Sequence, residues 1–172
     1  FATDGPHREK ASKLLATLLM TLRGTPYVYQ GDEIGMTNVA FEDPADYKDV
    51  ETLNWFKSLE AEGKNPKDHL KTVHEIGRDN ARTPIQWADE KNAGFTEGEP
   101  WIKVNPNYPD INVEDQERNI NSILNYFRKA IQFRKEHKTF VYGDYEPVQK
   151  DHPQIFAYRR WDESGSYIVI HN

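Results

Sequence analysis

Apolar residues recur at helical spacing in two stretches of the chain, and each stretch predicts a helix. The first stretch ends at Gly24, a residue typical of helix C-termini. Its recurring positions are Ala11, Leu15, Leu18 and Leu22. The second stretch predicts an amphipathic helix over residues 120–137. Its apolar stripe consists of Ile120, Ile123, Leu124, Phe127, Ala130 and Ile131.

Short runs of β-type residues follow each of these helices. Residues 26–29 are aromatic or β-branched after an initial proline, and they predict a buried strand. After the second helix the pattern predicts strands at 140–148, 155–161 and 167–170. The strand at 26–29 needs neighbours to satisfy its backbone edges, and this chain does not obviously supply them. We therefore expect the chain to be a piece of a longer protein.

Residues 31–119 form a long, irregular excursion in which Pro and Gly recur. Short apolar stripes predict helices at 50–61 and 66–76 within it. Ordinary connections between elements are only ~4–6 residues long. An excursion of this length therefore predicts a functional segment or a small subdomain. The change of period after the second helix predicts a domain boundary near Lys138.

The composition excludes several functional classes. The chain has 172 residues, of which 37% are hydrophobic and 29% charged, as in a globular protein with one ordinary core. Its net charge of −6, with both signs interspersed, argues against a nucleic-acid partner. Cysteine is absent, so we expect no disulfide, thiolate nucleophile or cysteine metal site. No apolar run approaches ~20 residues, so we expect no membrane partner.

The run at 77–87 combines arginines with polar and aromatic side chains in a loop. Arg78 and Arg82 are planar, permanently charged forks that fix carboxylates or hydroxyls. Asp79, Asn80 and Gln86 add polar groups, and aromatic faces follow at Trp87, Phe95 and Trp101. This mixture suits a sugar, which has hydroxyl edges and C–H faces. The alternative is that the two arginines only staple an irregular loop.

Other polar groups have simpler interpretations. Asp32 and Glu33 are adjacent, so on an extended segment they point to opposite faces and cannot serve as a facing acid and base. We expect one of them to tether the loop. The histidines show no metal-ligand spacing; His69 and His74, five positions apart, would not share a helix face. We therefore expect no metal site and no cofactor.

Three motifs resemble the oligo-1,6-glucosidase group of the α-amylase superfamily. They lie at residues 24–36, 49–54 and 77–87, with a further matching run at 92–101, and the resemblance covers the whole chain. It implies an α/β fold, the C-terminal portion of a (β/α)8 TIM barrel followed by the first strands of a C-terminal β-sandwich domain.

On that template, residues 1–138 are the last helix-strand-helix units of the barrel, including the long βα loop at 31–119. The helix near residues 11–22 is the seventh of the barrel, 26–29 the eighth strand, and 120–137 the last helix. Residues 139–172 begin the β domain. Active sites of such barrels lie on the βα loops, so the resemblance places the long loop on the catalytic face.

The resemblance also implies an activity, namely exo-acting, retaining hydrolysis of α-1,6-linked gluco-oligosaccharides such as isomaltose. Two carboxylates about 5 Å apart carry out this reaction, and a third stabilises the transition state. In the family all three would precede Phe1, so we assign no catalytic residue to this chain. We expect the chain alone to be inactive without the missing N-terminal part of the barrel.

Two residues carry over as substrate contacts. Arg78 resembles the family arginine at the bottom of the pocket, which pairs with an aspartate upstream of this chain and holds the hydroxyl edge of the non-reducing glucose. In the family this pairing closes the pocket and makes the enzyme exo-acting. Glu51 resembles the acidic residue that contacts the second sugar in 1,6-specific members. Its motif, residues 51–54, fits the 1,6 and trehalose-6-phosphate branch better than the sucrose isomerases. The alternative for Glu51 is a helix-start carboxylate stabilised by the helix dipole.

Two rival functions stay open. The first is trehalose-6-phosphate hydrolase, which would need a cationic subsite for the phosphate. The second belongs to another class, a non-catalytic relative acting as an ancillary subunit of a transporter; the presence of Arg78 and Glu51 disfavours it. For the enzyme, we expect a cytoplasmic location.

Overall fold

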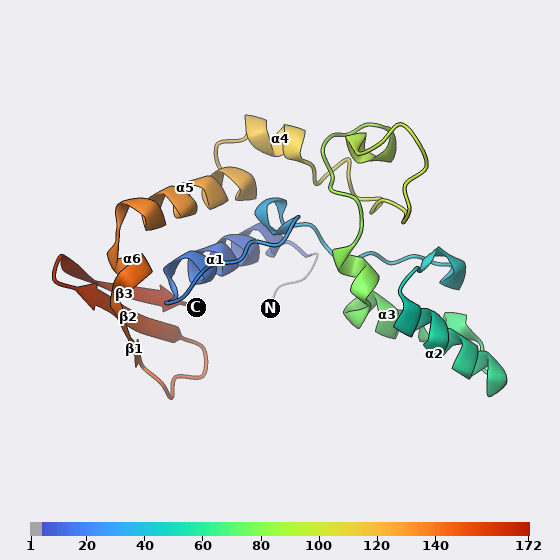
Figure 1. The fold of residues 1–172 in the computed structure, drawn as a ribbon, viewed down its shortest axis with the longest axis horizontal. Coiled ribbons are helices and arrows are strands. Elements are labelled where there is room, and N and C mark those ends of the chain that lie inside the picture. Colours follow the sequence, from blue (N-terminus) through green and yellow to red (C-terminus); the bar gives the residue numbers. More distant parts are fainter. Residues whose placement is uncertain (1–4) are drawn as a thin grey trace. The chain divides into compact units, whose positions relative to one another are not determined.

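The computed structural model describes residues 5–172 (Figure 1). The chain divides into two compact units. Unit 1 comprises the residues up to Gly35 together with Asn119–Asn172, and unit 2 comprises Met36–Arg118. Unit 2 therefore coincides with most of the long excursion predicted from the sequence. The predicted domain boundary near Lys138 stays a prediction.

Unit 1 is built on two packed helices, and both were predicted. Helix α1 spans Arg8–Thr21 and helix α5 spans Ile123–Glu136. Ala16 and Met20 of α1 pack against α5 in a small core, while Leu15 of the predicted stripe is largely exposed. Ser122 begins α5, because its side chain accepts the backbone N–H of Asn125 at 3.1 Å. The cap therefore begins the helix at Ile123, three positions after the predicted start.

A three-stranded antiparallel sheet follows α5 in unit 1 (Figure 1). Its strands, in the order β1-β2-β3, are β1 at Asp144–Val148, β2 at Phe156–Asp162 and β3 at Gly165–His171. The predicted start of the first strand at residue 140 is wrong, since Thr139–Tyr142 form the short helix α6. The Arg160 guanidinium donates to the carbonyls of Thr139 and Phe140, which holds this turn in a helical conformation.

The predicted buried strand at residues 26–29 does not form in this structure. These residues have no regular secondary structure, and Tyr27 is 83% exposed. The only sheet among the described residues is the three-stranded one after α5, so no neighbouring strand pairs with 26–29. The physical reason is the one that the sequence suggests, namely that a single strand cannot satisfy its own backbone edges. The short 3-10 helix η1, Asp32–Ile34, follows this segment.

Unit 2 consists of short helices joined by loops. The α-helices are α2 at Val50–Ala61, α3 at Leu70–Ile76 and α4 at Val113–Arg118. The 3-10 helices are η2 at Pro44–Asp46, η3 at Pro66–His69, η4 at Arg78–Ala81 and η5 at Lys91–Gly94. The predicted helix at 50–61 is confirmed, and the one at 66–76 is confirmed as η3 followed by α3.

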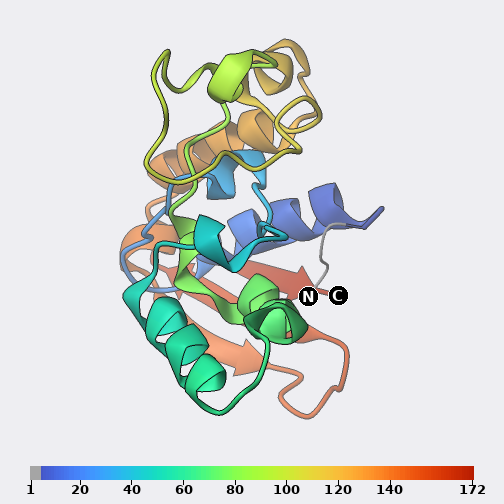
Figure 2. The same cartoon turned by 90° about the vertical axis from the view of Figure 1, so that its right-hand side faces the viewer.

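Helices α2 and α3 lie side by side in both views (Figure 2). The core of unit 2 lies between them and the preceding loop, and it consists of Val39, Phe41, Tyr47, Phe56, Leu59, Leu70, Val73 and Ile102. This packing fixes the start of α2 and the end of α3, where the candidate site lies. None of the helices within residues 5–172 is long and apolar enough to cross a membrane.

Candidate functional site

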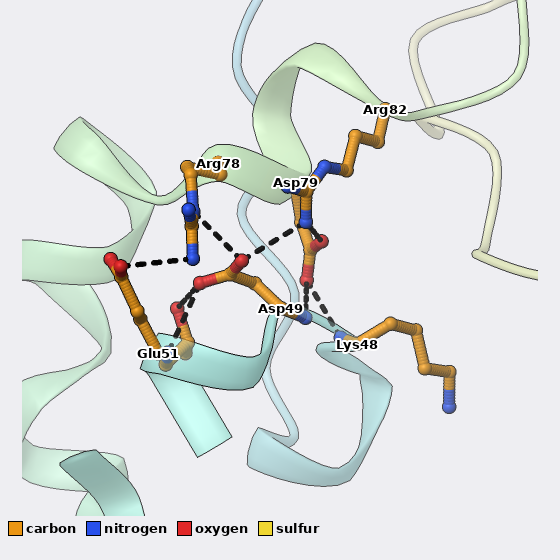
Figure 3. Close-up of polar contacts among 7 residues, drawn as sticks. Lys48, Asp49, Glu51, Arg78, Asp79 and Arg82 are labelled. Carbon is orange, nitrogen blue, oxygen red and sulfur yellow. Dashed lines mark hydrogen bonds and ion pairs between the residues drawn. The ribbon is translucent and has the colours of Figure 1, made fainter. Parts of the chain in front are cut away.

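The buried carboxylate of Asp49 is the centre of a polar cluster at the start of α2 (Figure 3). Asp49 caps this helix, because its Oδ2 accepts the backbone N–H of Thr52 at 3.1 Å and the Thr52 hydroxyl at 3.2 Å. Its Oδ1 accepts Nε of Arg78 at 2.9 Å and Nη1 of Arg82 at 3.0 Å. One side chain therefore joins α2 to η4.

A second buried carboxylate, Asp79, holds the backbone that leads into α2. Its Oδ2 accepts the N–H of Lys48 at 2.7 Å and the N–H of Asp49 at 2.9 Å. Its Oδ1 lies 3.5 Å from Nη1 of Arg82. Asp49 is thus held at two points. Its backbone N–H is bound by Asp79, and its side chain is bound by Arg78 and Arg82.

The structure brings the two predicted site residues, Arg78 and Glu51, together. Nη2 of Arg78 lies 3.3 Å from Oε1 of Glu51, and their side chains are 48% and 77% exposed. Glu51 lies in the first turn of α2, so the helix dipole also favours its charge, as the alternative interpretation holds. Both side chains remain accessible to a ligand. Their roles as substrate contacts stay predictions.

A hollow of about 270 Å³ opens beside this pair, within unit 2. It is lined by Asp49, Glu51, Thr52, Trp55, Thr72, Val73, Ile76, Gly77 and Arg78. The lining combines the charged groups of Asp49, Glu51 and Arg78 with apolar side chains from α2 and α3. A surface of this kind matches the hydroxyl edges and C–H faces of a sugar ring.

Electrostatics keep Asp49 charged despite its burial. Burial alone would raise the pKa of Asp49, but hydrogen bonds from the Thr52 backbone, Arg78, Arg82 and the Thr52 hydroxyl outweigh it, so the pKa is lowered. A carboxylate that is ionised at neutral pH can orient two guanidinium groups at once. Asp49 lies in the motif at residues 49–54, but no role was predicted for it. Its place just before the apolar stripe of the predicted helix at 50–61 is typical of a helix cap, and that pattern could have identified it.

Several polar residues of the 77–87 run serve the loop itself. Gln86 is fully buried, and its side-chain amide donates to the Ile111 carbonyl at 2.7 Å and to Asn107 Oδ1 at 3.0 Å. The Asn80 side chain accepts the Val39 N–H at 3.1 Å and donates to the His74 carbonyl at 3.0 Å. Gln86 and Asn80 therefore hold the loop together, although the sequence suggested them as polar groups for a sugar. Trp87, Phe95 and Trp101 are exposed but do not line the hollow beside Arg78.

Asp32 and Glu33 both tether the loop after residues 26–29. Asp32 accepts the Tyr29 N–H at 3.3 Å, and Glu33 accepts the Gly31 N–H at 2.8 Å. Burial raises the pKa of Asp32, partly offset by its hydrogen bond from Tyr29. The prediction assigned this task to one of the two residues. Among the described residues, no group of three or more His, Asp or Glu side chains is placed to hold a metal ion.

The chain is similar in sequence and in structure to known proteins. The family described as "Alpha amylase, catalytic domain" matches residues 1–143. An oligo-1,6-glucosidase of Parageobacillus thermoglucosidasius is 49% identical over the whole chain, which covers 31% of that protein. The crystal structure of a Bacillus licheniformis trehalose-6-phosphate hydrolase superposes on 98% of this chain and 30% of its own, with a TM-score of 0.92 at 43% identity.

A third relative has been solved with a sugar bound. An isomaltulose synthase variant from Erwinia rhapontici, in complex with its natural substrate sucrose, matches 99% of this chain and 31% of its own, with a TM-score of 0.90 at 44% identity. The chain thus spans about a third of the length of these relatives. With residues 1–143 matched by the family, the chain belongs to the α-amylase family and forms part of its catalytic domain.

Proposed function

We propose that the complete protein is an exo-acting, retaining α-glucosidase that hydrolyses α-1,6-linked gluco-oligosaccharides in the cytoplasm. Membership of the α-amylase family and the 49% identity to an oligo-1,6-glucosidase support the reaction class. The observation that carries the proposal is the contact between Arg78 and Glu51 beside an accessible hollow. The two residues expected to contact adjacent sugars are neighbours in space, although they lie 27 positions apart (78 − 51) in the chain.

The proposed place of each segment follows the barrel template. Helix α1 is the seventh barrel helix, residues 26–29 the eighth strand, unit 2 the loop after it, and α5 the last helix. The sheet β1-β2-β3 begins the C-terminal β-sandwich domain. The exposure of residues 27–29 supports this assignment, because a central barrel strand needs partners on both sides.

In this mechanism the segment binds and orients the substrate but supplies no catalytic carboxylate. A nucleophile and a general acid from other barrel loops, about 5 Å apart, form and then hydrolyse a glycosyl-enzyme intermediate. Arg78 donates hydrogen bonds to the hydroxyl edge of the non-reducing glucose, and its pairing with an aspartate from the upstream part of the barrel closes the pocket. The Glu51 carboxylate, largely exposed, accepts hydrogen bonds from hydroxyls of the second sugar. Fixing both rings in this way lowers the entropic part of the barrier.

Trehalose-6-phosphate hydrolysis is the second candidate. The close structural match to a hydrolase of that specificity supports it. The two candidates differ in the second ring, which carries a phosphate in one case and is neutral in the other. The anionic Glu51 at this position favours the neutral ring, since like charges repel.

Glucose release by the complete enzyme from isomaltose and from trehalose 6-phosphate, assayed side by side, tests the proposal. Faster turnover of isomaltose is expected. Preference for trehalose 6-phosphate would move the protein to the second candidate, and no release from either substrate would contradict both. The 172-residue chain by itself is expected to release no glucose, because the family template places all three catalytic carboxylates upstream of it.

A further inference from the structure

The Arg78 guanidinium has two edges, and the described residues bind only one of them. Nε and one N–H of Nη2 form the side edge, and the two amino groups form the end edge. The side edge is bound by two carboxylates, with Nε on Asp49 at 2.9 Å and Nη2 near Glu51 at 3.3 Å. Within residues 5–172, Nη1 of Arg78 has no hydrogen-bond partner, so these residues leave the end edge uncovered.

Of the two carboxylates, only Asp49 is rigidly held. Four donors bind it: the Thr52 N–H and hydroxyl, Arg78 Nε and Arg82 Nη1. Its backbone N–H is bound in turn by Asp79. Glu51, by contrast, is 77% exposed and contacts Arg78 alone among these charged groups. Asp49 therefore sets where Nε of Arg78 lies, and Glu51 can follow the ligand.

The charges of the two arginines also make Asp49 the group that positions Arg78. Arg78 and Arg82 both donate to the same oxygen, Oδ1 of Asp49, at 2.9 and 3.0 Å. Without the negative charge between them, the two guanidinium groups would repel each other and Arg78, the more exposed of the two, would turn outward. The position of Arg78 thus depends on an ionised side chain that is itself almost fully buried.

We propose that Asp49 is a positioning residue of the substrate site, which binds the side edge of Arg78 so that the end edge faces the hydroxyls of the sugar. This inference rests on the proposed function, in which Arg78 contacts the substrate. It assigns Asp49 no contact with the reacting atoms. Its effect on the reaction passes through Arg78 alone.

A double-mutant cycle in the complete enzyme tests this inference. Asp49→Asn places an amide against donors on both sides, so one of its contacts must break. Misplacement of a binding group by about 1 Å lowers kcat/KM by about 100-fold. We expect Asp49→Asn and Arg78→Ala each to lower kcat/KM for isomaltose by about this factor, and the double variant to lose no more than Arg78→Ala alone. Asp43→Asn is the matched control, because Asp43 caps η2 in the same unit without contacting an arginine.

The outcomes separate this inference from the proposed function. Losses that multiply in the double variant would show a merely structural role for Asp49 and overturn the inference. A loss with Arg78→Ala but none with Asp49→Asn would also overturn it, while leaving the proposed function intact. No loss with Arg78→Ala would contradict the substrate contact itself.

If Asp49→Asn does not fold, Thr52→Val replaces it in the cycle. This change removes one donor to Oδ2 of Asp49 and retains the backbone cap. A loss of several-fold that disappears in the Arg78→Ala background supports the inference. No loss, or one that persists in that background, overturns it.

Discussion

Arg160 in unit 1 and Arg78 in unit 2 show two opposite uses of an arginine. Arg160 is fully buried, and all five of its N–H donors bind backbone carbonyls. These carbonyls belong to Thr21, Thr139, Phe140, Gly143 and Asp144. Arg78 is half exposed, is bound along one edge only, and its partners are carboxylates.

The partners decide what each arginine can do. Carbonyls carry no net charge, so Arg160 keeps its positive charge inside unit 1; burial lowers its pKa, and the nearby charge of Arg134 adds to this effect. Neither Arg160 nor Arg134 forms an ion pair within residues 5–172. A saturated guanidinium fixes a fold, whereas one with an open edge can bind a ligand. The contrast predicts different consequences of mutation in the two units.

The largest effect is expected from Arg160→Leu. This change leaves five carbonyls at the junction of α1, α6 and β1 without their donor, and the loss of such a buried network costs about 3–5 kcal/mol. Hydrogen exchange of the β2 amides in the complete protein measures the loss. Arg159→Leu is the matched control, because the adjacent Arg159 is exposed and binds only Ser166 and the face of Trp161. Equal protection of the β2 amides in Arg160→Leu and Arg159→Leu would contradict the structural role of Arg160.

The next effect concerns activity and not stability. Arg78→Lys keeps the charge but has no planar fork, so it cannot bind Asp49 along one edge and a sugar along the other. We expect kcat/KM for isomaltose to fall about 100-fold, equivalent to about 2.7 kcal/mol, with unfolding changed by less than about 0.5 kcal/mol. Steady-state kinetics and thermal unfolding of the same samples measure both. A stability loss as large as that of Arg160→Leu would contradict the functional assignment of Arg78.

A smaller effect is expected from Glu51→Gln. The amide keeps one acceptor for a sugar hydroxyl but loses the charge that holds Nη2 of Arg78 at 3.3 Å. Exposed ion pairs contribute little, so we expect a fall of about 10-fold in kcat/KM for isomaltose and little change in stability. The ratio of isomaltose to maltose turnover tests the linkage preference. An unchanged ratio with an unchanged rate would show that Glu51 is only a helix-start carboxylate.

Elements that are determined by residues close together in the chain could be predicted from the sequence. Helix α2 has the predicted bounds because Asp49 and the stripe through Phe56 and Leu59 lie within a few positions of each other. The segment at 26–29 was predicted wrongly as a buried strand, since its partners are not supplied by this chain. The helical turn at 139–142 was missed because it is held by Arg160, which lies 21 positions after Thr139 and 20 after Phe140.

The candidate site shows the same division. Family resemblance indicated Arg78 and Glu51, but their contact depends on the packing of α2 against α3, which no local pattern encodes. The role of Asp49 was hidden because one carboxylate serves both a local cap and two arginines that lie 29 and 33 positions away. Only the folded geometry shows that these tasks share one side chain.

The smallest effect, a dependence on pH, again differs between the units. In unit 1, burial lowers the pKa of His171 below 6.5, so the unfolded chain takes up the proton first. The contribution of neutral His171 is therefore present above pH 6.5 and is lost as the pH falls from there through the folded pKa. In unit 2, the pKa of Asp49 lies below 3.8, so its contribution is present above that value and is lost only at lower pH.

Acidification from pH 7 should therefore weaken unit 1 before unit 2. Hydrogen exchange of β3 and of α2 in the complete protein, measured between pH 7 and pH 4.5, compares the two units once the intrinsic pH dependence of exchange is corrected. His171→Gln removes the titrating group and is expected to flatten the response of β3 without changing that of α2. The two pH ranges, one assigned to His171 and the other to Asp49, are wrong if α2 loses protection first or if β3 keeps its full pH dependence in this variant. A group buried without a charged partner loses its contribution at mild acidity, whereas one held by two arginines keeps it.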